Sequence, residues 1–315
     1  MPTVPYNPIK LYTDQFKAIL AQAQATDNPA QYLYHKGARN VLFMLEALTR
    51  LHEPIITQPK LEQWQGRFKL LEDLLGELDY VDNYNQQLAN KKGIPAKQIQ
   101  VLESRCKGIE DNINTILLTK KWVLNHLAKF EAFIAKQNLV FDVAYTHAIA
   151  ASYTKEVDKV NAYIQFINGN YTQLEEQVHE VRRKLRWLSI YAQCMQGLFT
   201  LHKPKATPAW SKKYMTKAVV SSPYNKLAKA PKSLSTIPLN YYAFVTLSYT
   251  IDALGAIKDT GLLSHLLQQE LGYTTPQVSK LLGKAYVTES ALLSKASTLL
   301  QGVTKARVLQ QLVVG

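Results

Sequence analysis

Four side chains that can carry positive charge lie at helical spacing within residues 171–202. They are His179, Arg182, Arg183 and Arg186, and a helix would place them on one narrow strip. Neighbouring like charges on a helix repel by roughly a few tenths of a kcal/mol per pair, so folding alone does not explain the cluster. Guanidinium groups match phosphate oxygens in bidentate fashion. The strip is therefore a candidate oxyanion site, and a solvated helix face is the alternative.

The charge of the whole chain is concentrated around this strip. The formal net charge is +13, and the segment from Val181 to Ile251 holds twelve Lys or Arg residues and no Asp or Glu. The rest of the sequence therefore carries only +1. A positive field this localised attracts a polyanion.

A long helix over Tyr171–His202 is expected to position the strip. Seven apolar side chains recur at steps of three and four on its other face: Val178, Val181, Leu185, Leu188, Ala192, Met195 and Phe199. Turn and cap signals divide the remaining sequence into further helices over 9–25, 29–52, 59–88, 95–137, 141–167 and from 239 to the C-terminus. Asp27 or Asn28 is expected to cap the second of these. The expected fold class is all-α.

Composition narrows the class of protein. Apolar residues make up 47% and charged residues 19%, which is typical of a folded soluble protein. The sequence contains no run of 18 apolar residues, so no membrane span is expected. The N-terminus does not resemble a signal peptide. The two cysteines, Cys106 and Cys194, lie far apart and give neither a disulfide framework nor metal-ligand spacing. We expect a cytoplasmic protein with no cofactor and no metal.

Residues 203–238 differ in amino-acid composition from the rest of the sequence. They contain five prolines, eight lysines and no acidic residue, which predicts a loop or partly ordered insertion. The lysines, including Lys203, Lys205, Lys212 and Lys213, are expected to lie beside the arginine strip and contribute to the same anion site. A disordered basic linker is the alternative.

An internal repeat accounts for the layout. His35 corresponds to His179, and Gly76 corresponds to Gly255. The first pair is 41 residues apart and the second 76, and the excess of 35 is close to the length of the insertion. The expected repeats cover residues 1–170 and 171–315 and form one compact unit. The helices that carry the two histidines are expected to pack near a pseudo-two-fold axis.

These elements resemble the CHAD family, the conserved histidine α-helical domain. That family has two helical repeats, each with a His-x-x-Arg motif, further basic residues on the same face, and a Leu-Gly-x-x-Arg-Asp-like element. The second repeat matches at His179, Arg182 and Arg186, with Trp187 and Ser189 where more basic residues are usual. Its glycine element matches at Leu254, Gly255 and Asp259, with Lys258 in the basic position.

The first repeat departs from the family pattern. It keeps His35, followed by Lys36, but has Ala38 and Leu42 at the +3 and +7 positions, with Arg39 one position late. Gly76 is followed by Asp79 and Tyr80 instead of Arg-Asp. Any anion contacts in this repeat would come from His35, Lys36 and Arg39.

The resemblance implies two pseudo-symmetric helical bundles with basic side chains meeting at a central groove or pore. It implies non-catalytic binding of inorganic polyphosphate, and association with polyphosphate granules. The physical chemistry agrees, because polyphosphate offers only charged oxygen acceptors, which suit arginine forks and lysine point charges.

Three alternatives remain. Basic residues interleaved with Trp187, Tyr191, Trp210, Tyr214 and Tyr224 would also suit the backbone and bases of a nucleic acid, although no known binding signature appears. An enzyme is not expected, because the sequence lacks a P-loop, a nucleophile elbow and the Glu-x-Glu-x-Lys signature of triphosphate tunnel domains. A helical scaffold whose ancestral site has decayed is the third.

Overall fold

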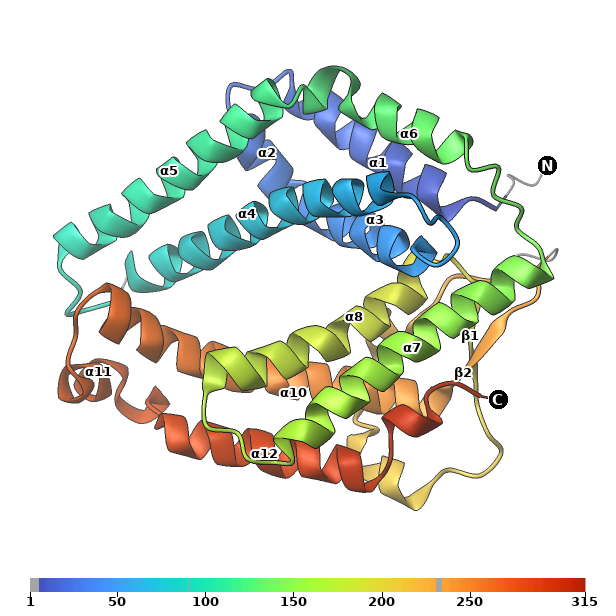
Figure 1. Ribbon diagram of the computed structural model, residues 1–315. Coiled ribbons are helices and arrows are strands. Elements are labelled where there is room, and N and C mark those ends of the chain that lie inside the picture. Colours follow the sequence, from blue (N-terminus) through green and yellow to red (C-terminus); the bar gives the residue numbers. More distant parts are fainter. Residues whose placement is uncertain (1–5, 90, 231–233, 315) are drawn as a thin grey trace. The chain divides into compact units, whose positions relative to one another are not determined.

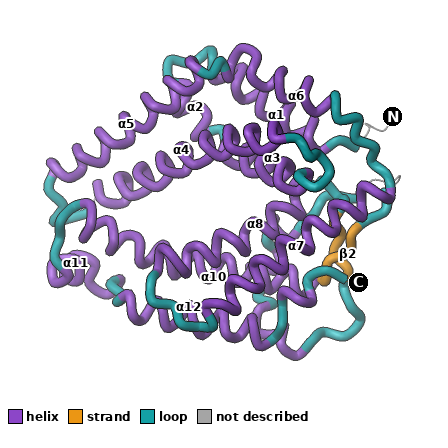
Figure 2. The backbone as a smooth tube through the Cα atoms, viewed as in Figure 1, coloured by secondary structure: helices purple, strands orange, loops and turns teal. Residues whose placement is uncertain are grey.

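The computed structural model describes residues 6–89, 91–230 and 234–314. The chain divides into two compact units, Met1–Phe141 and Asp142–Gly315. Both are built from helices, and one short two-stranded sheet is the only sheet in the part of the chain that is described (Figures 1 and 2). The all-α class predicted from the sequence is confirmed. Among the described residues, no helix is both long and apolar enough to cross a membrane.

In the described residues of the first unit there are six α-helices and a π-helical segment. They are α1 (Pro8–Ala23), α2 (Pro29–His35), α3 (Ala38–His52), α4 (Pro59–Ala89), α5 (Ala96–Thr119), η1 (Trp122–His126) and α6 (Leu127–Ala135). The long helix α4 packs against α3 and, on another side, against α5, and α1 covers α3 (Figure 1). Helix α4 is thus the centre of this unit.

Two of the expected helices in the first unit are interrupted. The stretch 29–52 divides into α2, which ends at His35, and α3, because Gly37 between them adopts a left-handed φ of 69°. Asn28, one of the two expected caps, accepts a hydrogen bond from the backbone of Gln31. The stretch 95–137 is broken at Lys121, whose φ is 54°.

Aromatic rings fill the core of the first unit. Trp64 contacts Phe68, Phe130 and the imidazole of His126, with ring centroids 6.0, 5.2 and 4.8 Å away. Burial lowers the pKa of His126 to about 4, and the charges of Arg67, Lys129 and Lys120 act in the same direction. A neutral imidazole is therefore part of this core at neutral pH.

We expect acid to destabilise the first unit because of the buried His52, the last residue of α3. Its side chain is fully buried, its Nδ1 lies 2.7 Å from the Leu48 carbonyl oxygen, and burial lowers its pKa to about 4. Between pH 6.5 and 4 the unfolded chain binds a proton that the folded chain does not. The unfolding free energy is therefore expected to fall by up to about 1.4 kcal/mol per pH unit lost, from this group alone.

Urea unfolding at pH 6.5, 5.5 and 4.5 measures this effect. His52→Leu should flatten the pH dependence by about one proton. The exposed His147 supplies the control, His147→Gln, which should keep the wild-type dependence. An unchanged slope in His52→Leu would contradict the assignment.

The second unit contains helices α7, α8, α9, α10, α11 and α12 and strands β1 and β2. Their bounds are α7 (Val143–Ile167), η2 (Leu174–His179), α8 (Glu180–Cys194), β1 (Phe199–His202), η3 (Ala209–Tyr214), α9 (Lys217–Ser221), η4 (Pro223–Asn225), β2 (Ile237–Asn240), α10 (Tyr241–His265), η5 (Leu266–Glu270), α11 (Thr275–Leu282), η6 (Gly283–Ala285), α12 (Glu289–Lys305) and η7 (Leu309–Gln311). Helix α10 packs against α8 and α12, and α7 packs against α8. Helix α7, expected in the first repeat, therefore belongs to the second unit.

The expected helix 171–202 is shorter than the sequence predicts. Its first turn and a half is the π-helical segment η2, and α8 ends at Cys194. Gln196 and Gly197 then take left-handed φ values of 45° and 91°. A Cβ atom at Gly197 would overlap the Lys229 carbonyl oxygen, so this turn requires glycine. Phe199 lies in a strand, not in the predicted helix, although it is buried as expected.

The insertion is ordered over most of its length. Strand β1 enters it and β2 leaves it, and the two pair in parallel with Phe199 opposite Ile237. Short helical segments η3, α9 and η4 lie between them. Ser211 and Tyr214 are buried, and the Tyr214 ring contacts that of Tyr249 on α10. The expected loop is therefore a packed segment, except that residues 231–233, and with them Lys232, lie outside the described residues.

Candidate functional site

Helix α8 presents the predicted arginine strip opposite a buried face. All seven apolar side chains of the predicted stripe are buried: Val178, Val181, Leu185, Leu188, Ala192, Met195 and Phe199. Arg182 and Arg186 are half-buried, and Arg183 is exposed. The packing of the stripe thus fixes the direction in which the cations project from the second unit.

Arg182 is held by backbone groups of α10. Its Nε donates to the carbonyl oxygen of Ile251 at 3.2 Å. The guanidinium lies against Gly255, where an added Cβ would come within 3.0 Å of Nε. Among the described residues, no carboxylate lies within ion-pair distance of Arg182. The protein therefore orients this guanidinium without neutralising it.

The neighbouring cations of α8 share one carboxylate. Glu180 lies 2.8 Å from Nη2 of Arg183 and 3.0 Å from Nζ of Lys184. Burial opposes ionisation of Glu180, but its hydrogen bonds to Lys184 and Arg183 hold its pKa below the usual range. Two cations therefore meet one anion, and the charge on this turn stays positive. Lys184, which the sequence analysis did not select, also lies over the ring of Tyr163 at 4.8 Å.

His179 contacts a glutamate that lies one turn before it in the chain. Nδ1 of His179 lies 2.9 Å from Oε2 of Glu175. Burial raises the pKa of Glu175, but the His179 hydrogen bond and the charges of His179, Lys258 and His265 outweigh burial, and the net pKa is lowered. Lys258 is largely buried, with 18% of its side chain exposed, and its Nζ lies 3.6 Å from Asp259. His179 is thus engaged with a carboxylate.

The first unit has a similar arginine and glycine but a different charge. A Cβ at Gly76 would come within 2.5 Å of Nη2 of Arg39, as one at Gly255 would approach Arg182. Here, however, Arg39 is paired on both sides: Nε lies 2.8 Å from Glu72, and Nη1 lies 3.0 Å from Asp79. The two carboxylates occupy the donors that a phosphate would use. Glu72 and Asp79 flank Gly76 on one face of α4, so an arginine of α3 that packs on Gly76 lies between them.

The other two candidates of the first unit are exposed. The His35 ring lies 4.9 Å from that of Tyr34, and Nζ of Lys36 lies 5.7 Å from the ring of Tyr32. The Tyr34 hydroxyl donates to Asp82 at 3.1 Å, and burial followed by the charges of Asp79 and Asp82 raises its pKa. Acidic groups therefore dominate this side of α4.

Two lysines of the insertion, Lys203 and Lys213, lie against α10 and α12. Nζ of Lys203 lies 5.2 Å from the ring of Tyr241, the first residue of α10. Lys213 and Tyr214 lie against Gly302 of α12. Lys205 and Lys212 are exposed. The later part of the insertion meets α8, where the Gln193 side chain donates to the Tyr224 carbonyl oxygen at 3.1 Å.

Neither a search for metal-binding clusters nor comparisons with known proteins assign a function to these residues. Within the described residues, no group of three or more His, Cys, Asp or Glu side chains could hold a metal ion. No family model, no curated protein and no solved structure matches the chain. The resemblance to the CHAD family therefore rests on the motif residues themselves and stays a prediction.

Proposed function

We propose that the second unit binds inorganic polyphosphate, without catalysis, through the basic face of α8 and α10. This basic face consists of Arg182, Arg183, Arg186 and Lys258. The observation that carries the proposal is the state of Arg182. Its guanidinium is oriented by the Ile251 carbonyl and has no carboxylate partner among the described residues. An oriented, unneutralised guanidinium is what a phosphate oxygen requires.

The chemistry of the basic face favours a linear polyphosphate. Such a chain carries about one charge per phosphate and has only oxygen acceptors, so guanidinium and ammonium donors match it along its length. Arginine supplies directional pairs of hydrogen bonds, and the lysine supplies a point charge. The resemblance to the CHAD family supports the same ligand. The insertion lysines raise the positive potential of this unit.

The first unit is proposed to contribute little. Its candidate arginine, Arg39, is already paired with Glu72 and Asp79. A phosphate would have to displace both carboxylates and would leave Glu72, whose side chain is only 7% exposed, as an unpaired charge. The decay seen in the first-repeat motif is thus accompanied by a substitute partner for its arginine.

A nucleic acid fits the basic face less well. Trp187 is half-buried and stacks on Tyr191 at 5.6 Å, and Tyr191 is 1% exposed, so the ring face between them is not open to a base. Tyr224 is 67% exposed but lies in the insertion. Competition between polyphosphate and single-stranded RNA of equal charge separates the two ligands.

Binding is expected to weaken steeply with salt. If four cations each neutralise one phosphate, the slope of log K against log salt should be about −3, by analogy with about −0.7 per contact for single-stranded nucleic acids. Fluorescence anisotropy of labelled polyphosphate at 50, 100 and 200 mM salt measures the slope. Tighter binding of RNA than of polyphosphate would favour a nucleic-acid ligand. Binding of neither would favour a helical scaffold.

A further inference from the structure

The second unit also contains a pocket whose charged lining is mainly acidic, in contrast to the basic face. It has a volume of about 360 Å³ and lies between η2, the C-terminal end of α10, η5, α11 and the start of α12. This size is at the lower end of the range for small-molecule pockets.

Carboxylates dominate the charge of this pocket. Glu175, Glu176 and Glu289 line it, and none of its lining residues is Lys or Arg. Glu289 lies in the first turn of α12, where the helix dipole stabilises its negative charge. This anionic region contrasts with the rest of its unit, in which 20 Lys and Arg residues outnumber 10 Asp and Glu residues. It would repel the phosphate ligand of the basic face.

Two oxygens at the pocket have no partner. Oε1 of Glu175 and Oγ of Ser264 are both buried from solvent and make no hydrogen bond, although both residues line the pocket. Oε2 of Glu175 is bonded to His179, and its Oε1 is enclosed by protein atoms. The exposed carboxylates of Glu176 and Glu289 are therefore the ones open to a ligand in this pocket.

The remaining wall is apolar. Leu174, Val287 and Leu292 line the pocket, and Leu174 packs tightly against Gly261 of α10. A ligand that fits these walls needs a short hydrocarbon segment between groups that donate hydrogen bonds and carry positive charge. An ammonium group supplies three donors and one charge. We propose that this pocket binds an aliphatic diamine, with its ammonium groups on the carboxylates and its methylenes against the leucines.

Other ligand classes fit these walls less well. A divalent metal would need three converging His, Cys, Asp or Glu side chains, and no such group occurs in the described part of the chain. An anion would meet three carboxylates. A neutral diol could bond to Ser264 but would bring no positive charge to Glu176 and Glu289.

The test is isothermal titration of the full chain with 1,4-diaminobutane. Saturable binding with one site is expected, with butylamine at least 10-fold weaker and 1,4-butanediol showing no saturation in the same range. The double variant Glu176→Gln with Glu289→Gln should bind the diamine at least 10-fold more weakly. Glu175 is left intact because it also contacts His179.

A charge-matched control and a second ligand make the result specific. Glu53→Gln with Glu103→Gln removes two exposed carboxylates from the first unit and should leave diamine affinity unchanged. The proposal is independent of polyphosphate binding, so the pocket variant should keep wild-type polyphosphate affinity or exceed it. Absence of saturable diamine binding, equal binding of the diol, or wild-type affinity in the pocket variant would overturn it.

Discussion

Replacing Arg182 and Arg186 together by glutamate is expected to weaken polyphosphate binding at least 100-fold. A hydrogen bond to a charged group is worth roughly 1.5–3 kcal/mol, so two lost contacts alone remove roughly 3–6 kcal/mol. The new carboxylates add repulsion. The salt dependence should become shallower, because fewer counterions are released. The helix should persist, since its stripe of Val181, Leu185 and Leu188 is untouched and Arg and Glu have similar helix propensities.

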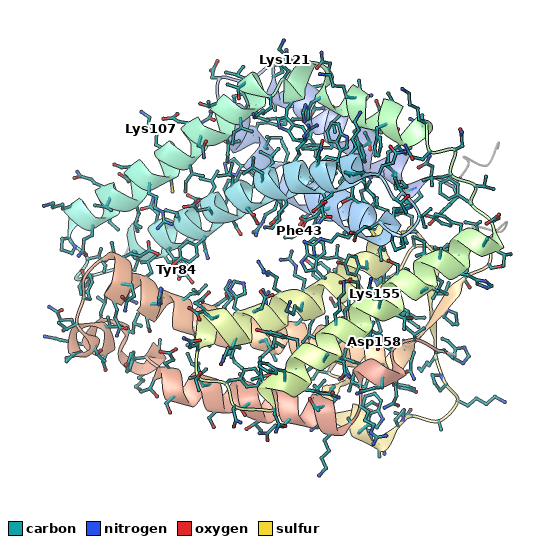
Figure 3. The ribbon with its side chains drawn as sticks, viewed as in Figure 1. Phe43, Tyr84, Lys107, Lys121, Lys155 and Asp158 are labelled. Carbon is teal, nitrogen blue, oxygen red and sulfur yellow. The ribbon has the colours of Figure 1, made fainter. Side chains whose placement is uncertain are left out.

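The control variant changes the net charge of the protein by the same amount, but at two lysines outside the basic face. Lys107 on α5 and Lys155 on α7 are exposed and lie away from the basic face residues in sequence (Figure 3). Lys107→Glu with Lys155→Glu should lower affinity only through the general field of the protein, and more so at low salt. Circular dichroism checks that both variants are folded. A folded arginine variant with wild-type affinity and salt slope would place the site elsewhere.

Replacing Arg39 by alanine is expected to reduce stability and to leave polyphosphate affinity unchanged. The change strands the buried carboxylate of Glu72, and breaking one side of a buried ion pair costs about 3–5 kcal/mol. Arg39 is 31% exposed, so solvent screening reduces this cost to about 2–3 kcal/mol. Arg182→Ala, which strands no carboxylate, should show the reverse: lower affinity and little loss of stability.

Urea unfolding and polyphosphate titration of both alanine variants separate these roles. Arg39→Met with Glu72→Met removes both partners of the pair and should recover much of the lost stability. If Arg39→Ala instead stays as stable as the wild type and loses affinity, the first unit contains an anion site after all.

Helices and buried faces were predictable because they depend on short-range periodicity. The stripe of α8 is buried over its whole length, and the breaks at 91–93 and 168–170 occur where turn residues cluster. The all-α class follows from the same pattern. The pairing of the two units about a two-fold axis remains a prediction.

The errors come from contacts distant in the chain. The turn after α8 packs against Lys229, whose carbonyl oxygen leaves no room for a Cβ at Gly197. Strand β1 exists only because Ile237 pairs with it from beyond the insertion. Likewise, the motif spacing identified Arg39 as a cation, but its neutralisation by Glu72 depends on how α4 packs on α3. The acidic pocket combines five elements and has no local signal.

Gly76 and Gly255 separate two kinds of evolutionary constraint. In each unit the position requires glycine, because an arginine from another helix occupies the space where a Cβ would lie. That constraint concerns volume, and it holds whether the arginine faces a carboxylate, as Arg39 does, or none, as Arg182 does. Natural selection can therefore change the ligand of either arginine by exchanging nearby acids while the glycine persists. In this chain, each of the two glycines marks a position on which an arginine packs. The charges around that arginine then decide whether it can bind an anion.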